Sequence, residues 1–284
     1  MLDVWVCSTC HSINRERSAA CYKCGSPRSR STGEGEGLRP HRAIQARLDS
    51  GYRETTGLAV LTGSLILVVV GLEIYLTVLE RASVSTVLGL LDSIAAGGPF
   101  DRAAWDATFA STDQLALPAL IVFAATLVVF ATWLSVTIGN VPGLGGGEPS
   151  VTRLGAFVWA VVPIVNLRRI PRIIQEVLYR LDPRGGGVLL IAFAWIGLVG
   201  SWIVARIAGF YINSRLSFDA FNAESLPAFA TSSRQLLEWA YILDVVTTLM
   251  IAFGAVLLIV IIAQVERRAA ARNREIEATL GPAT

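Results

Sequence analysis

Four long stretches of apolar residues alternate with segments that carry the charges. Each stretch is long enough to cross the hydrocarbon core of a bilayer, which takes about 20 helical residues. The stretches are residues 57–79, 115–138, 188–211 and 241–265. A fifth apolar stretch, residues 154–167, is shorter and contains Pro163, so it is expected to be a re-entrant or broken helix. The pattern predicts an all-α membrane bundle of four spanning helices plus this short broken helix.

Arginines gather in the segment before the first span, in the segment before the third and in the tail after the fourth. The other two loops hold few of them. The three arginine-rich groups are Arg39, Arg42, Arg47 and Arg53; Arg168, Arg169, Arg172, Arg180 and Arg184; and Arg267, Arg268, Arg272 and Arg274. All three lie on one side if the chain crosses four times, and the positive-inside rule then predicts that both termini are cytoplasmic. A crossing by residues 154–167 would export the basic tail.

All four cysteines of the chain fall near its start, in two Cys-x-x-Cys pairs that are separated by ten residues. They are Cys7, Cys10, Cys21 and Cys24. This is the ligand spacing of a structural zinc site in which four thiolates bind one Zn²⁺ tetrahedrally. The alternatives are two disulfides, which need an oxidising compartment, and an iron–sulfur centre, which usually has a longer interval between the pairs. We therefore expect one structural zinc ion, whose binding folds a segment too short to bury a core.

The residues around the cysteines resemble the zinc finger of the Ran-binding-protein (nucleoporin) type. The resemblance covers residues 3–28 and rests on the pattern Trp5-x-Cys7-x-x-Cys10-x-x-x-Asn14 followed by Cys21-x-x-Cys24. It implies that Trp5 packs on the metal core and that Asn14 ties the two knuckles together. Members of this family bind either ubiquitin or single-stranded RNA.

The positions that contact those two partners in the family differ in this chain. The ubiquitin-binding members have a Thr-Phe pair where this chain has His11 and Ser12, which argues against ubiquitin. The RNA-binding members have an aromatic residue after the asparagine, whereas here Arg15 follows, and Arg17 keeps one of their arginines. Arginine stacks on bases and pairs with phosphate, so RNA stays open as the weaker interpretation. A protein-binding or purely structural finger is favoured over it.

A proline-rich motif precedes the third long span. It consists of Trp159, Pro163, Asn166 and Pro171, in the sequence Trp-x-x-x-Pro-Ile-x-Asn-Leu followed by a second proline. The motif resembles the signature of a bacterial multi-spanning family that is described only as a domain of unknown function. The resemblance runs from residue 57 to the charged tail, includes Trp133, Leu134 and Asn140, and implies a fold but no activity. Pro163 removes a backbone donor, and Asn166 is able to bond the carbonyl so freed. Such a break either turns the chain or lines a site for a ligand or ion.

Three ionisable residues lie inside the predicted spans: Glu73, Arg206 and Asp244. By helical rise each falls roughly 6–10 Å from the outer end of its helix, so we expect Arg206 to pair with one or both acids. The pair would serve either as an interhelical clamp or as part of a proton or ion pathway. Small residues recur every four positions on the same helix and predict that it is central in the bundle; they are Gly197, Ser201, Ala205 and Gly209.

The composition argues against an enzyme, because the only two histidines, His11 and His41, precede the first span. An intramembrane Ser–His pair or His-Glu-x-x-His metal site is thereby excluded. We divide the chain into a finger (1–28), a flexible linker with a juxtamembrane basic helix (29–56) and a membrane domain with a cytoplasmic tail (57–284). The expected function is that of a bacterial inner-membrane adaptor or sensor, whose cytoplasmic finger binds an unidentified protein. The alternatives are a small transporter or channel that the finger regulates, and membrane-tethered binding of single-stranded RNA.

Overall fold

Long helices make up most of the protein. The computed structural model describes residues 4–6, 13–15, 52–99, 101–182, 186–222 and 225–280. The helices are α2 (Thr56–Ala95), α3 (Arg102–Asn140), α4 (Arg153–Val161), α5 (Pro163–Leu181), α6 (Val188–Trp195), the π-helical segment η1 (Ile196–Gly200), α7 (Ser201–Asn222) and α8 (Leu226–Leu280). Because α6, η1 and α7 follow one another without a gap, they form one continuous rod.

Within the residues that the structure describes, four helical segments are long and apolar enough to cross a membrane, as the hydropathy pattern predicts: Thr56–Ala95, Gln114–Asn140, Val188–Asp219 and Pro227–Ala278. The helices are longer than the apolar stretches. The 40 residues of α2 extend about 60 Å, twice the thickness of a hydrocarbon core. A small second core forms where α2 and α8 continue past their apolar stretches, built on Val87, Leu91, Ile94 and Ala230. The chain is therefore a multi-pass membrane protein whose helices are longer than its apolar stretches.

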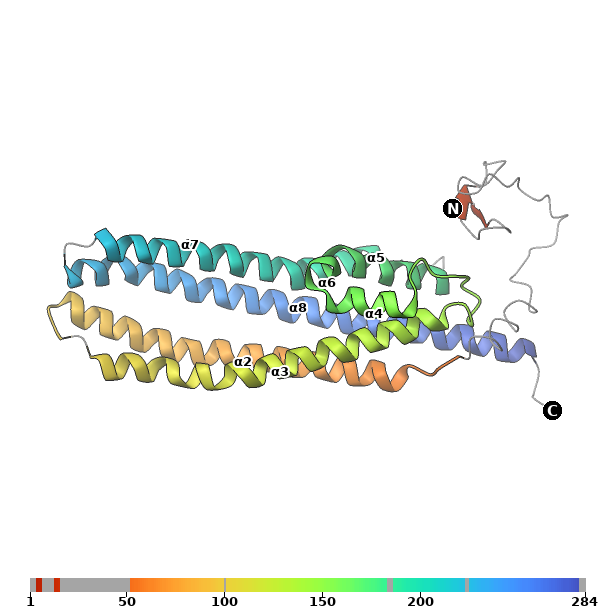
Figure 1. Cartoon of the computed structure of the whole chain (residues 1–284), viewed down its shortest axis with the longest axis horizontal. Helices are drawn as coiled ribbons and strands as arrows, with labels where there is room; N and C mark the ends of the chain where they lie inside the picture. The colour runs from red at the N-terminus through yellow and green to blue at the C-terminus, as the bar shows by residue number, and fades with distance from the viewer. Residues whose placement is uncertain are drawn as a thin grey trace.

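The long helices pack side by side in the order α3, α2, α8, α7. Helix α2 lies between α3 and α8, and α8 in turn packs against α7. The shorter helices α4, α5 and α6 gather beside α8 at one end of the molecule (Figure 1). The larger core lies at this end and includes Trp133, Leu134, Ile170, Ile174 and Ile261. All the arginine-rich segments that the structure describes also lie there, as expected for four crossings.

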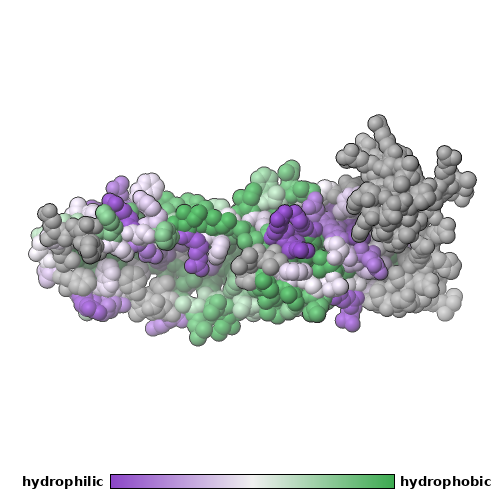
Figure 2. Space-filling view, turned by 45° about the horizontal axis from the view of Figure 1, so that its top comes forward, coloured by the Kyte–Doolittle hydropathy of each residue, from purple (hydrophilic) through white to green (hydrophobic). Residues whose placement is uncertain are grey.

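Hydrophobic residues cover much of the middle of the molecule, as expected for a surface that contacts lipid. Figure 2 shows hydrophobic patches along the middle of the visible face, with hydrophilic residues toward both ends and some between the patches. Large apolar side chains on α3 and α7 are exposed in the protein alone, among them Leu117, Leu120, Ile207 and Phe210. Exposure of this kind along a long helix is typical of membrane proteins.

Two glycines allow η1 and α8 to cross at close range. A methyl group added at Gly197 in η1 would come within 2.7 Å of the Gly254 Cα in α8, and one at Gly254 within 2.8 Å of the Ala194 carbonyl. The helix backbones therefore touch, in the manner of small-residue interfaces in membranes. The predicted small-residue ridge packs only in its first half, since Gly197 and Ser201 are buried whereas Ala205 is exposed and Gly209 has open space beside it.

The predicted break at Pro163 is present as a boundary between two helices. Helix α4 ends at Val161, Val162 is extended (φ −81°, ψ 109°), and Pro163 is the first residue of α5. The residue before a proline is driven out of the helical region, and proline at the first helical position loses no hydrogen bond. With nine residues α4 extends about 14 Å and is too short to cross a bilayer. The short stretch is thus a helical hairpin, not a fifth span.

A two-stranded hairpin lies near the start of the chain. Strand β1 (Val4–Val6) pairs antiparallel with β2 (Ile13–Arg15), and Trp5 is opposite Asn14. The four predicted zinc ligands, Arg17 and the linker up to residue 51 lie outside the described residues.

Candidate functional site

The segment that leads into α2 is fastened to α3 by a buried asparagine. Asn140, with 3% of its surface exposed, donates from Nδ2 to the Arg53 carbonyl at 2.6 Å. Its Oδ1 accepts from the Arg53 backbone N–H at 3.1 Å. The side-chain amide thus satisfies both backbone groups of one residue, as a neighbouring β-strand would. The chain that enters the bundle is held at this point.

A carboxylate on α8 holds the next residues of the same segment. Glu266 accepts hydrogen bonds from the Thr55 hydroxyl at 2.8 Å and from the Trp133 indole N–H at 2.9 Å. Thr55 and Trp133 are almost completely buried. Glu266 on α8 therefore joins the segment before α2 to α3. Hydrogen bonds to a charged group contribute about 1.5–3 kcal/mol each. We call Arg53, Thr55, Trp133, Asn140 and Glu266 the junction.

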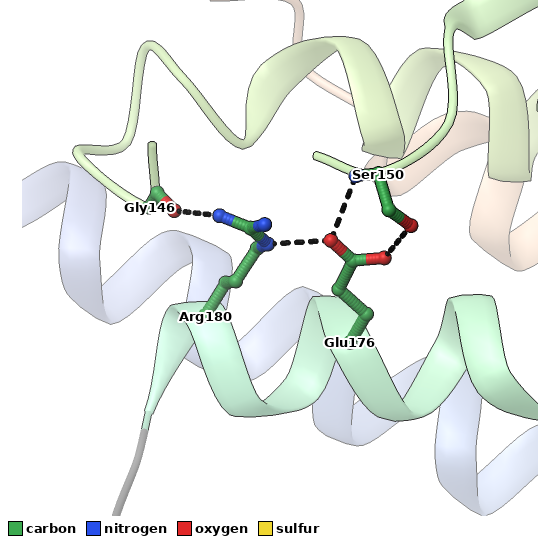
Figure 3. Close-up of polar contacts among 4 residues, drawn as sticks. All are labelled: Gly146, Ser150, Glu176 and Arg180. Carbon is green, nitrogen blue, oxygen red and sulfur yellow. Dashed lines mark hydrogen bonds and ion pairs between the residues drawn. The ribbon is translucent and has the colours of Figure 1, made fainter. Parts of the chain in front are cut away.

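A second polar cluster clamps the loop between α3 and α4 onto α5 (Figure 3). Glu176 accepts from the Ser150 backbone N–H at 2.8 Å and also bonds the Ser150 hydroxyl. Arg180 donates to Glu176 at 2.8 Å and to the Gly146 carbonyl at 2.8 Å. The loop needs the glycines, since Gly145 and Gly147 have φ values of +76° and +72°. The four residues of Figure 3 are called the loop clamp below.

Two arginines of the C-terminal part of α8 bond backbone carbonyls near the loop clamp. Arg268 donates to the Leu178 carbonyl at 3.2 Å and to the Gly186 carbonyl at 2.9 Å, at the C-terminal end of α5. Arg272 donates to the Leu144 carbonyl at 3.2 Å. Cationic side chains are favourable where a helix leaves its last carbonyls unpaired. The basic tail is thus also structural, beyond the topological role that its charge predicted.

The proline motif has a structural explanation that involves a residue outside the motif. Pro171 lies inside α5 and has no N–H for the Leu167 carbonyl, four residues earlier. The Trp195 indole N–H donates to that carbonyl at 2.8 Å and replaces the missing bond. Trp159 is half-buried, with the Arg169 guanidinium 5.0 Å from its ring. The Asn166 backbone is helical, and its side chain lies outside the part that the structure describes.

The predicted intramembrane ion pair is wrong. Arg206 is exposed on α7, 5.7 Å from the Trp202 ring, and no ion pair joins it to an acid within the described parts of the chain. The reason is rotational, because Arg206 is nine residues beyond the Gly197 crossing, about half a turn around the helix. Glu73 and Glu80 of α2 do lie near Asp244 of α8 across the α2–α8 interface.

The sequence patterns point to Trp133 and Asn140 of the junction, but they give no role to Thr55, Glu176 or Glu266. Glu176 and Arg180 have a readable helical spacing of four residues. Glu266 and Thr55 are 211 residues apart, and no local pattern relates them.

One comparison with known proteins gives a match. The model of DUF4328, a domain of unknown function, matches residues 98–267. No curated protein and no solved structure matches the chain. The matched range contains the whole proline motif, the loop clamp, and Trp133, Asn140 and Glu266 of the junction, while α2 precedes it.

Proposed function

The chain belongs to the DUF4328 family, a domain of unknown function, and we propose that it is a membrane-anchored adaptor or sensor. In this proposal the bundle holds an N-terminal zinc finger at the face of the membrane where the arginine-rich segments lie, and this face is cytoplasmic. The finger binds a cytoplasmic protein. The chain carries out no chemical reaction of its own.

The junction is the observation that carries the proposal. The backbone of Arg53 is bonded on both sides by Asn140, and Thr55 is bonded by Glu266. An anchor alone needs only an apolar helix, and it gains little from buried polar bonds to the residues that precede it. Attachment of the incoming chain to both α3 and α8 would transmit a conformational change in the N-terminal part to the bundle.

The finger would be held by one zinc ion that is bound to the thiolates of Cys7, Cys10, Cys21 and Cys24. The pairing of β1 with β2 supports this, because residues 7–12 connect the two strands, as expected for a knuckle. The position of Trp5 opposite Asn14 is compatible with the structural roles that the resemblance implies for both residues. A closed four-thiolate shell supplies folding free energy and no open coordination position for catalysis.

The test combines metal analysis with capture from native membranes. Purified protein is expected to hold one zinc per chain, and a Cys21→Ala variant that reaches the membrane is expected to lose it. After crosslinking in cells, the intact protein should capture a specific protein that the Cys21→Ala variant does not. Asn140→Ala should keep the zinc and the partner but alter the crosslinking sites within the bundle. An identical capture by Cys21→Ala would refute the adaptor function.

An Arg15→Gln/Arg17→Gln variant separates protein binding from RNA binding. It keeps all four thiolates and therefore the zinc. If the captured molecule is RNA, this double variant should lose it, because the two arginines are the candidate contacts to bases and phosphates. A protein partner should be retained by the double variant and lost only with the metal.

A small transporter or channel is the second candidate, and the acids between α2 and α8 favour it. Glu73, Glu80 and Asp244 lie close together there, and the hydroxyls of Thr77 and Thr248 bond each other at 2.8 Å between the same helices. Acids within membrane helices often mark proton or ion paths. Proteoliposomes loaded with a pH-sensitive dye test this directly. Proton flux that is lost in Asp244→Asn would support transport, and no flux above empty liposomes would exclude a proton path.

A further inference from the structure

Three arginines form a basic surface on α5. The helix buries Ile170, Ile173, Ile174 and Val177 against the bundle. Its exposed side carries Arg168, Arg169 and Arg172. Spacings of three and four residues place their side chains next to one another on a helix surface. We call these three residues the arginine surface.

The positive charge of the arginine surface is not compensated within the described residues. None of the three arginines forms an ion pair with an acid of that part of the chain. The acid that follows on α5, Glu176, is engaged by Ser150 and by Arg180 in the loop clamp. Arg169 stacks at 5.0 Å from the Trp159 ring, which orients its guanidinium and leaves its charge in place.

The surroundings of the arginine surface are apolar. The bond from the Trp195 indole to the Leu167 carbonyl fixes this turn of α5 beside the end of α6, about 10 Å from the start of α6 by helical rise. Large apolar side chains on the neighbouring helices α4 and α6 are exposed, among them Val158, Leu189 and Phe193. Figure 2 shows hydrophilic residues lying directly beside hydrophobic patches on the visible face. The arginines therefore lie where apolar side chains meet lipid, and arginine stems extend from such positions toward the headgroups.

We propose that the arginine surface is a binding site for the phosphate of an anionic phospholipid. The planar guanidinium donates paired hydrogen bonds to phosphate oxygens, and basic pockets between membrane helices bind anionic headgroups. The apolar side chains beside the site match the acyl chains of a lipid and give a free anion no advantage. The hairpin of α4 and α5 thereby fixes the position of a lipid next to the loop clamp.

The test measures lipid binding to the purified full-length protein. Detergent-solubilised protein is titrated with phosphatidylglycerol or phosphatidylcholine, and the bound lipids are counted by native mass spectrometry. Near a membrane surface each arginine contributes about a fivefold gain in affinity for anionic lipid, so Arg168→Gln/Arg172→Gln should bind phosphatidylglycerol about thirtyfold more weakly. The matched control is Arg267→Gln/Arg274→Gln, which removes two exposed arginines of α8 and should change the affinity less than threefold.

Three results would overturn the proposal. The first is equal loss of phosphatidylglycerol binding in the control variant, which would show a general charge effect. The second is equal binding of phosphatidylcholine and phosphatidylglycerol by the intact protein. The third is displacement of the lipid by millimolar inorganic phosphate, which would make this a free-anion site. If the glutamine variant does not fold, Arg168→Lys/Arg172→Lys keeps the charge but loses the paired donors, and it should bind with intermediate affinity.

Discussion

Asn140 offers the sharpest test of the junction, because its two bonds join α3 to a segment that is 87 residues away in the sequence. Replacement by alanine removes both bonds. A typical intramolecular hydrogen bond contributes about 1 kcal/mol net. Water can reach the partly buried Arg53 backbone after the substitution, so the full penalty for unsatisfied groups does not apply. The two bonds together should therefore stabilise the attachment of this segment by about 2 kcal/mol.

Hydrogen exchange followed by mass spectrometry measures how firmly this segment is attached, through the exchange rate of its backbone amides. A change of about 2 kcal/mol corresponds to roughly a thirtyfold faster opening-limited exchange of the Arg53 amide. The peptide that covers residues 52–58 should therefore exchange faster in Asn140→Ala, whereas peptides from the middle of α8 should not change. Asn213→Ala is the matched control, because Asn213 is an exposed residue of α7.

Asn140→Asp separates hydrogen bonding from side-chain volume. The aspartate keeps an acceptor for the Arg53 N–H but places a carboxylate oxygen against the Arg53 carbonyl, in the position of the present 2.6 Å bond. It should therefore loosen the segment at least as much as alanine does. Unchanged exchange of residues 52–58 in both variants would refute the conclusion that the junction holds this part of the chain.

Three further predictions concern thermal unfolding in detergent. Trp195→Phe should cost about 1–3 kcal/mol, because the Leu167 carbonyl, which Pro171 deprives of its helical N–H partner, loses the indole donor. In a Pro171→Ala background, where the helical N–H is restored, the same change should cost much less. Gly254→Ala should destabilise by at least 2 kcal/mol, since its methyl group would meet backbone atoms at 2.8 Å, whereas Gly71→Ala in open space should be neutral or stabilising. Glu80→Gln should raise the melting temperature by roughly 2–4 °C, because burial and the nearby Asp244 across the α2–α8 interface both disfavour the charged form of Glu80. An unchanged or lower melting temperature would argue that this acid pair is already neutralised.

The membrane part of the fold could be predicted because its signals are local. Span length, the position of Pro163 and the spacing of the arginines each depend on a short window of sequence. The helix extensions could not be predicted in the same way. Val87, Leu91 and Ile94 have helical spacing, but that face becomes a core only because α8 supplies Ala230 beside it.

The predicted intramembrane ion pair is wrong because of the rotation of α7 about its own axis. Counting residues gives the depth of a side chain along a helix, and the count correctly put Glu73 and Asp244 at the same level. The face of the helix that packs inward depends on one crossing, that of Gly197 with Gly254, and on the π-helical turn of η1 around it. A sequence gives the depth of Arg206 but not the direction in which its side chain points.

Among the described residues, most hydrogen bonds from side chains to distant parts of the chain lie at one end of the bundle, and the bond between Thr77 and Thr248 is an exception. Their distribution bears on the proposed function. Membrane helices associate through close packing, and the Gly197–Gly254 crossing supplies this in the middle of the bundle without hydrogen bonds between side chains. The junction and the loop clamp, by contrast, join the incoming segment, the loop before α4 and α8 through charged and amide side chains. Polar bonds of this kind have only a few favourable geometries, so they break in steps when one partner is displaced. A signal that pulls on residues 52–55 would therefore act first on Asn140 and Glu266, at the two helices that contain them, before it disturbs the packed middle of the bundle.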